Sequence, residues 1–388
     1  MPSSWRAALP EILIAAHSGR ALAAAARASG YAPLVADFFG DIDTREIAAD
    51  SCVVEGDFAR GFEAAPLFAA LDRLARGRAP VGVAVGTGFE DRPALLDAIA
   101  RRWPLIGNDA AAVALVKDPP AFAALCAAAG VPHPATSLAP PPAGADWLVK
   151  RAGGSGGTHI EVFAGQATAA GRYFQERMPG VPVSLLLLAS GGDAQVLGAS
   201  RQWTAPRSAI LRRKPILHGE NGLSPLDGTC RHGGALRPWS GPALRKMHAA
   251  ALALIPATGL RGLASFDFLV DGARFALLEI NPRPGATLDI FAHPQLFSAH
   301  VAACAGTLPA IPLHFADAQA AATLYCKNDI AQMPVLDWPD WVRDRSPPGS
   351  RLRSGDPLCT IISRASAPDA ARRLLDLRSA ELRARLNQ

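Results

Sequence analysis

The stretch LLEINPRPGATLDI, residues 277–290, starts as an apolar strand and then carries three polar side chains at alternate positions. Because alternate residues of a strand share a face, Glu279, Asn281 and Arg283 should project together. Leu278 and Ile280 should then lie in the opposite layer. Carboxylate and amide oxygens suit Mg²⁺, and an arginine one step further along could contact phosphates. A plain polar face, in which Glu279 pairs with Arg283, explains the same pattern equally well.

The segment ASFDFLVDG, residues 264–272, precedes this stretch and is expected to be its hairpin partner, with DG as the turn. Sequence alone does not fix the pairing register, but the hairpin would place Asp267 near the level of Glu279 or Asn281. Two carboxylates and an amide oxygen would then lie close together.

A glycine-rich loop follows Lys150 in VKRAGGSGGTHIEV, residues 149–162. Its place between two apolar runs is expected of a loop that covers phosphates with backbone amides. A glycine-rich hairpin turn is the alternative, and the spacing differs from that of a P-loop. Lys150 immediately before the loop favours the phosphate interpretation.

The first hundred residues alternate apolar runs with alanine-rich helical patterns, as in EILIAA (11–16), RALAAAARASG (20–30) and APLVADFF (32–39). The order strand, helix, strand predicts a parallel, Rossmann-like sheet. The first turn lacks G-x-G-x-x-G, so dinucleotide binding there is not expected. From residue 146 onward short strands prevail, which predicts an antiparallel sheet with a helix at QATAAGRYF (166–174).

Composition narrows the functional class. A chain of 388 residues should form about two or three packed units. The net charge of +5 comes from scattered arginines without a polybasic block, so anionic small ligands are favoured over nucleic acid. The six cysteines include no C-x-x-C pair, which excludes a zinc ribbon. No apolar run approaches the roughly 20 residues of a membrane span and no leader pattern opens the chain, so a cytoplasmic location is expected.

In their order along the chain, the glycine loop after Lys150, the segment 264–272 and the stretch 277–290 resemble the motifs of the ATP-grasp superfamily. The resemblance adds Lys117 in VKDPPAFAALCAAAGVPHPAT (116–136) and an acidic hinge in YFQERMPGVPVS (173–184) to the segments above. The chain is similar to a group of predicted ATP-dependent carboligases, related to biotin carboxylase, from archaea and C1-metabolising bacteria.

The resemblance implies a combined α/β and α+β fold. A Rossmann-like βα domain is expected at residues 1–105, and an ATP-grasp domain of two α+β subdomains at 106–310, with a lid at about 135–180. A small β-rich C-terminal domain is expected at 311–388.

The resemblance also implies roles for individual residues. The expected cofactors are ATP and Mg²⁺, with Mn²⁺ as a substitute. Arg283 would be the catalytic residue that stabilises an acyl phosphate, and the metal ligands would be Asp267, Glu279 and Asn281. The expected ATP-binding residues are Lys117, Lys150, Gly153, Gly154, Ser155, Gly156, Gly157, Gln175, Glu176, Arg177 and Met178.

The implied activity is activation of a carboxylate by the γ-phosphate of ATP, followed by attack of an amine, in a pathway such as tetrahydromethanopterin or methanofuran synthesis. Small-molecule carboxylates and amines would be the partners, and a homodimer is one candidate assembly. Two alternatives stay open: a carboxylase that uses bicarbonate, and an ATP-binding regulatory protein without turnover. The second is disfavoured because every lysine, acid and arginine position is filled.

Two departures from the family pattern bear on nucleotide binding and on the class of ligase. The hinge is followed by PGVPVS (179–184), which lacks the acid that holds ribose hydroxyls in many members. Ser265 stands where dipeptide ligases have an arginine, which argues against that class. In the arginine-rich segment 201–240, Arg201, Arg213 and His218 could bind a substrate or lie in a solvated loop.

Overall fold

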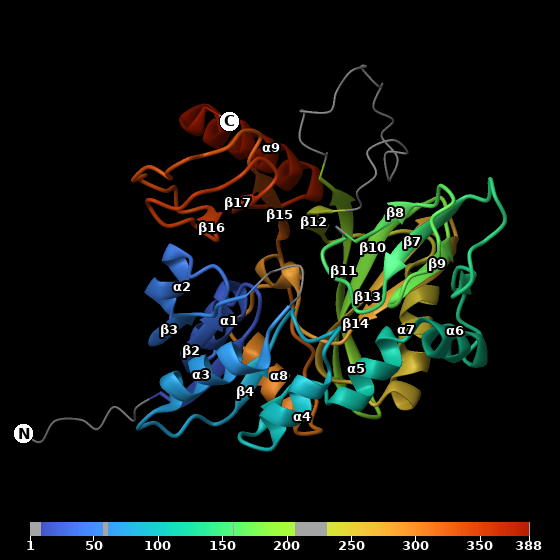
Figure 1. Ribbon diagram of the computed structural model, residues 1–388, viewed down its shortest axis with the longest axis horizontal. Coiled ribbons are helices and arrows are strands. Elements are labelled where there is room, and N and C mark those ends of the chain that lie inside the picture. Colours follow the sequence, from blue (N-terminus) through green and yellow to red (C-terminus); the bar gives the residue numbers. More distant parts are fainter. Residues whose placement is uncertain (1–8, 57–60, 158, 206–230, 388) are drawn as a thin grey trace, which may run out of the picture.

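The computed structural model describes residues 9–56, 61–157, 159–205 and 231–387. It combines one parallel sheet with two antiparallel sheets (Figure 1), which confirms the predicted mixture of α/β and α+β structure.

The N-terminal sheet has five parallel strands in the order β3-β2-β1-β4-β5. Ile12, Leu13 and Ile14 are fully buried because helices and the rest of the protein cover both faces of a parallel sheet. The strand order reverses between β1 and β4, so their carboxyl ends border the crevice where ligands commonly bind. The elements are β1 (Glu11–Ala15), α1 (Arg20–Ala28), β2 (Ala32–Asp37), α2 (Ile42–Ile47), β3 (Asp50–Val53), α3 (Ala64–Ala75), β4 (Val83–Val85), α4 (Ala94–Ala100) and β5 (Leu105–Ile106).

An eight-stranded antiparallel sheet, ordered β14-β13-β10-β11-β12-β15-β17-β16, forms the centre of the molecule. The run SLLLLA lies in β10, where both faces are buried: Leu185 and Leu187 pack with α6 and α7, whereas Leu186 and Leu188 pack with α8 and α1. The elements of this part are α5 (Ala110–Lys117), α6 (Pro119–Ala128), β10 (Val181–Ser190), β11 (Ala194–Thr204), β12 (His232–Arg237), α7 (Leu244–Thr258), β13 (Arg261–Asp271), β14 (Arg274–Asn281), η2 (Ala286–Asp289) and α8 (Leu296–Cys304).

The C-terminal strands continue this central sheet instead of forming a sheet of their own. β15 (Ala318–Tyr325) pairs with β12, and β17 (Pro357–Ala365) pairs with both β15 and β16 (Val342–Arg343). Helix α9 (Pro368–Leu386) covers them through Ala371, Leu375 and Leu382. In Figure 1 these elements, in orange and red, lie above the N-terminal sheet, in blue.

A separate four-stranded sheet, ordered β6-β9-β7-β8, carries the glycine-rich loop. The helix expected at residues 166–174 is absent: the chain there forms a loop and then enters β9. Phe174 is buried in β9, and pairing with β7 outweighs the weak helical preference of a short alanine run. The strands are β6 (Thr136–Ser137), β7 (Trp147–Arg151), β8 (Glu161–Val162) and β9 (Arg172–Glu176).

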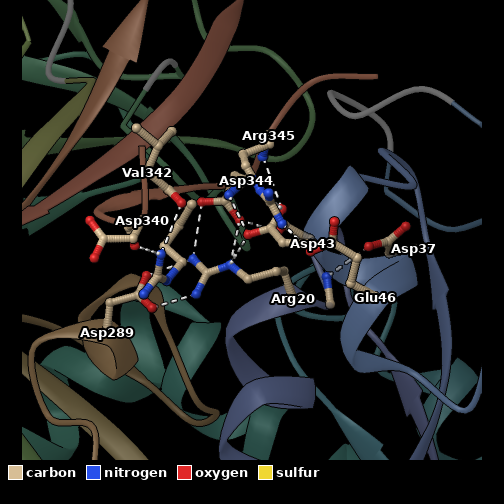
Figure 2. Close-up of polar contacts among 12 residues, drawn as sticks. Arg20, Asp37, Asp43, Glu46, Asp289, Asp340, Val342, Asp344 and Arg345 are labelled. Carbon is tan, nitrogen blue, oxygen red and sulfur yellow. Dashed lines mark hydrogen bonds and ion pairs between the residues drawn. The ribbon is translucent and has the colours of Figure 1, made fainter. Parts of the chain in front are cut away.

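A buried arginine joins the three parts of the chain (Figure 2). Arg20, at the start of α1, is 2% exposed and forms a two-pronged ion pair with Asp289 of η2, with Nη2 2.6 Å from Oδ2. Its Nε donates to Asp344 at 2.9 Å, and Asp43 of α2 lies 3.7 Å away. Asp43 also accepts from the backbone of Asp344 and Arg345. N-terminal, central and C-terminal segments therefore meet at one guanidinium.

Across the described ranges, no single helix is long and apolar enough to cross a membrane. Helices α5 and α6 have the length and composition only as a pair, and they are bent by 83°.

Candidate nucleotide and metal site

The predicted hairpin forms between β13 and β14. Asp267 lies directly opposite Glu279, and Ser265 lies opposite Asn281. Gly272 in the turn has φ of 60°, a left-handed conformation that favours glycine. The two acids therefore face each other across neighbouring strands, and Asn281 lies two residues beyond Glu279 on β14.

The expectation for Leu278 is wrong. The pairing shifts after Asp267, so that Phe268 lies opposite Leu277 and one residue of β14 is extra. This β-bulge interrupts the simple alternation. Leu277 and Ile280 enter the core, whereas Leu278 lines the same cavity as Glu279.

The polar face is held together by side-chain hydrogen bonds. Asn281 Nδ2 donates to Asp267 Oδ2 at 2.9 Å, and Ser184 Oγ donates to Asp267 Oδ1 at 2.6 Å. Lys117 Nζ lies 3.2 Å from Glu279 Oε2 and 3.1 Å from Asn281 Oδ1. Glu279 therefore pairs with a lysine from α5, and the plain pairing of Glu279 with Arg283 is not observed.

The two carboxylates differ in proton affinity. Burial and the neighbouring charge of Glu279 raise the pKa of Asp267 to about 6. Burial also acts to raise the pKa of Glu279, but Lys117 and Lys150 outweigh it and the pKa is lowered. A divalent cation would relieve the repulsion between these acids. Two carboxylates and an amide are hard oxygen donors, so Asp267, Glu279 and Asn281 fit Mg²⁺.

A cavity that opens to solvent separates this face from the sheet that carries the glycine loop. The side chain of Glu279 remains 43% exposed in it, whereas that of Lys117 is only 7% exposed. Lys150 is buried and its Nζ donates to Gln175 Oε1 at 2.6 Å. The lining residues are Val116, Lys117, Pro119, Phe122, His133, Thr136, Lys150, Arg151, Ala152, Gly153, Gly154, His159, Ile160, Tyr173, Gln175, Leu278 and Glu279.

The glycine loop and the hinge reach this cavity in part. Gly153 and Gly154 line it, while the carbonyl of Gly156 accepts from the amide of His232 at 3.1 Å. Ser155 and Gly157 are not among its lining residues. Of the hinge, only Gln175 lines it.

The three residues after Gln175 lie beyond the lining. The amide of Glu176 donates to the carbonyl of Ala135 at 2.8 Å, and the side chain of Arg177 pairs with Asp146. Met178 is half-buried. Their contacts with adenine stay a prediction.

Arg283 lies beside Asn281, at the edge of the polar face that Asp267, Glu279 and Asn281 form. Its side chain is 11% exposed, and its Nε donates to Glu90 Oε1 at 2.7 Å. Its Nη2 lies 3.3 Å from Asn281 Oδ1. The guanidinium therefore touches the ligand set through the same amide oxygen as Lys117.

The predicted substrate residues are not brought together. Arg201 is exposed on β11. Arg213 and His218 lie outside the described residues.

Three residues at the site were given no role by the sequence analysis. Glu90 follows β4, His159 follows the glycine loop and Tyr173 lies in β9. Burial, helped by Lys150 and other nearby cations and opposed by Glu279, lowers the pKa of His159 to about 4. An acid at the carboxyl end of a strand beside the point where strand order reverses is a signal that could have identified Glu90. His159 and Tyr173 become recognisable only once the sheets face each other.

Comparisons with known proteins agree with this geometry. The sequence of residues 121–287 matches the protein-family model of the ATP-grasp domain. Biotin carboxylase from Campylobacter jejuni, solved as a β,γ-ATP complex, has a TM-score of 0.66 at 14% identity over 94% of this chain and 89% of that one. N5-carboxyaminoimidazole synthetase from Staphylococcus aureus, solved with ADP, has a TM-score of 0.66 at 13% identity over 95% and 97%.

Pyruvate carboxylase from Rhizobium etli has a TM-score of 0.67 at 16% identity over 95% of this chain, which spans only 37% of that larger chain. No curated protein sequence matches significantly. Identities this low establish a shared fold. The chain therefore contains an ATP-grasp domain within a fold similar to those of biotin carboxylase and N5-carboxyaminoimidazole synthetase.

Proposed function

We propose that this protein is an ATP- and Mg²⁺-dependent ligase that activates a carboxylate as an acyl phosphate and joins it to an amine. The supporting observation is the pairing of Asp267 with Glu279 beside a cavity that also receives Lys117 and Lys150. Oxygen ligands, ammonium groups and a glycine loop around one space are what phosphoryl transfer needs, since that reaction depends on positioning and charge stabilisation.

Asp267, Glu279 and Asn281 would hold Mg²⁺, which would neutralise charge on the transferred phosphoryl group. Lys117 contacts oxygens of Glu279 and Asn281, so a metal would compete with its ammonium for them. Displaced from these oxygens, the ammonium could pair with phosphate.

Lys150, aligned by Gln175, would neutralise a second phosphate, and the amides of the glycine loop would exclude water. The planar guanidinium of Arg283 would bind the acyl phosphate and stabilise its transition state as the amine attacks. The carboxylate and amine come, in this proposal, from cofactor synthesis of the tetrahydromethanopterin or methanofuran type.

Carboxylation with bicarbonate is the second candidate. It is favoured by the fold similarity to biotin carboxylase and to N5-carboxyaminoimidazole synthetase, whose names refer to carboxyl transfer. Incorporation of labelled bicarbonate into a product that keeps the label in alkali would support it over amide formation, and release of that label as CO₂ on acidification would place the new carboxyl group on nitrogen.

The direct test is product analysis with Mg-ATP and a panel of amino acids, pterin-type and furan-type acids, amines and bicarbonate. Ligation predicts ADP and phosphate. AMP and pyrophosphate would contradict an acyl phosphate. Absence of turnover with every member, combined with tight ATP binding, would favour a regulatory protein instead.

Replacing Glu279 by glutamine should abolish turnover, because one charged ligand is lost while the shape is kept. Phosphate release should fall at least about 100-fold, with the thermal unfolding midpoint little changed. Glu63→Gln is a matched control, because Glu63 pairs with Arg92 and is 55% exposed. Normal activity in Glu279→Gln would refute the metal assignment.

A further inference from the structure

The turn after β4 contains an acid that is more buried than a surface turn would allow. Glu90 has a side-chain exposure of 4%. Its Oε2 accepts from the amides of Gly88 at 2.8 Å and Phe89 at 3.0 Å, and its Oε1 accepts from Arg283 Nε at 2.7 Å. Arg283 lies 193 residues further along the chain, so this contact joins the N-terminal domain to the metal face.

Glu90 is ionised at neutral pH. Burial alone would raise the pKa of a carboxyl group, but Arg283, Lys117 and the Gly88 amide outweigh it and lower the pKa of Glu90 to about 2. A buried charge needs this degree of compensation because an unpaired one is strongly destabilising. The carboxylate and the guanidinium therefore fix each other's orientation.

The same turn contacts the glycine loop. Gly153 has φ of +68°, and a Cβ atom at this position would lie 2.7 Å from the carbonyl oxygen of Glu90 and 2.7 Å from the Cα of Asp91. Real Cβ atoms do not approach backbone so closely. Glycine at 153 thus permits the loop to pack directly on the turn.

We propose that Glu90 is a positioning residue of the proposed ligase. Its carboxylate holds Arg283 beside Asn281, and its turn is the surface on which the glycine loop closes. The inference rests on the proposed function and assigns a role to the N-terminal domain within it. Loop closure and arginine orientation then depend on one turn, so a bound nucleotide and a correctly aligned guanidinium occur together.

The contacts allow this coupling without any further element. Arg283 donates hydrogen bonds to both Glu90 and Asn281, and Asn281 in turn donates to Asp267. A change in the turn therefore reaches the metal ligands through two side chains. Residues that touch a metal ligand, as Arg283 touches Asn281, commonly change activity by about 10- to 100-fold when they are replaced, and loss of the Glu90 contact that orients Arg283 should have an effect of that order.

The first experiment compares Glu90→Gln with Glu63→Gln. In Glu90→Gln, kcat should fall about 10- to 100-fold while KM for Mg-ATP changes less than about threefold, because nucleotide contacts remain. Glu63→Gln should match the wild type in both constants. A merely structural role would lower the unfolding midpoint without this split, and unchanged kcat in folded Glu90→Gln would overturn the proposal.

The second experiment needs no turnover. Amide hydrogen exchange of residues 150–157 is measured with and without a non-hydrolysable ATP analogue. Binding should protect the loop in the wild type, and Gly153→Ala should lose most of this protection while still folding. Gly165→Ala is the control, because a Cβ at Gly165 meets nothing within 4 Å and its φ of +89° imposes comparable backbone strain.

If ATP-analogue binding protects the loop amides equally in Gly153→Ala and in the wild type, the glycine loop does not close on the Glu90 turn. That result would overturn the proposal even if Glu90→Gln failed to fold. Absence of turnover in the wild type would instead count against the proposed function. The two failures are therefore distinguishable.

Discussion

Two buried arginines connect the N-terminal domain to the segment after β14, and they do so in opposite directions. Arg20 reaches from α1 to Asp289, whereas Arg283 reaches back to Glu90. Arg20 is surrounded by carboxylates from three parts of the chain (Figure 2), and Arg283 has one carboxylate and one amide oxygen. The comparison shows that a buried arginine can either hold segments of the chain together, as Arg20 does, or lie ready to bind a ligand, as we propose for Arg283.

The difference lies in the partners. Asp289 and Asp344 raise the pKa of Arg20 further although burial acts to lower it, and its donors are occupied by acids that hold neighbouring segments. Arg283 lies beside the predicted metal ligands with its charge balanced by a single acid. We expect replacement of Arg20 to change stability and replacement of Arg283 to change catalysis.

The largest expected effect follows from replacing Arg283 by lysine. The charge beside Glu90 is retained, but the planar fork is lost, so kcat should fall by about 10² to 10³. The unfolding midpoint should remain close to that of the wild type. Steady-state kinetics and thermal unfolding check this, and a variant that unfolds early with normal kcat would reverse the assignment of the two arginines.

Replacing Arg20 by methionine should act mainly on folding. It leaves Asp289 and Asp344 without their cation, whereas Asp43 keeps its ion pair with Arg345; the loss should cost about 3–5 kcal/mol of unfolding free energy. Arg274→Met is the control, since Arg274 is 85% exposed and its pair with Asp271 should contribute less than about 1 kcal/mol. Urea unfolding measures both. Equal stability of the two variants would show that Arg20 does not hold the three segments together.

The third prediction concerns the pH dependence of stability. Burial, with the charges of Asp344 and Asp37, raises the pKa of Asp41 to about 9. Because the folded pKa lies above the unfolded value, its stabilising contribution is complete below about pH 4 and is lost as the pH rises towards 9.

Asp41→Asn should remove this dependence. Relative to the wild type, the variant should become progressively more stable as the pH rises from about 4 to 9, by at most about 1.4 kcal/mol per pH unit. For Glu90 the pH dependence of stability has the opposite sign. Its pKa is lowered on folding, so its stabilising contribution is complete above about pH 4.5 and is lost as the pH falls towards 2. Parallel pH profiles for Asp41→Asn and the wild type would contradict the raised pKa of Asp41.

Local patterns predicted the hairpin and its polar face correctly. The DG turn and the alternation of Glu279 and Asn281 are local, so they could be read from the sequence. The bulge at Leu278 could not, because an inserted residue leaves no mark in composition. The helix expected at 166–174 failed because strand pairing with β7 outweighs alanine propensity.

Long-range partners were beyond local patterns. Glu90 contacts Arg283, and Arg20 contacts Asp289 across 269 residues. The local sequence around Glu90 and Arg20 does not indicate these partners. The ATP-binding and metal roles remain predictions that the experiments above address.

The addition of β15 to β12 has a consequence for how the chain may be divided. Cutting before residue 311 would leave β12 with a bare row of backbone donors and acceptors, a template for pairing with another molecule. Residues 318–365 thus act as an edge cover. A shortened protein should self-associate, so expression of the ATP-grasp portion alone would yield assemblies that the intact chain avoids.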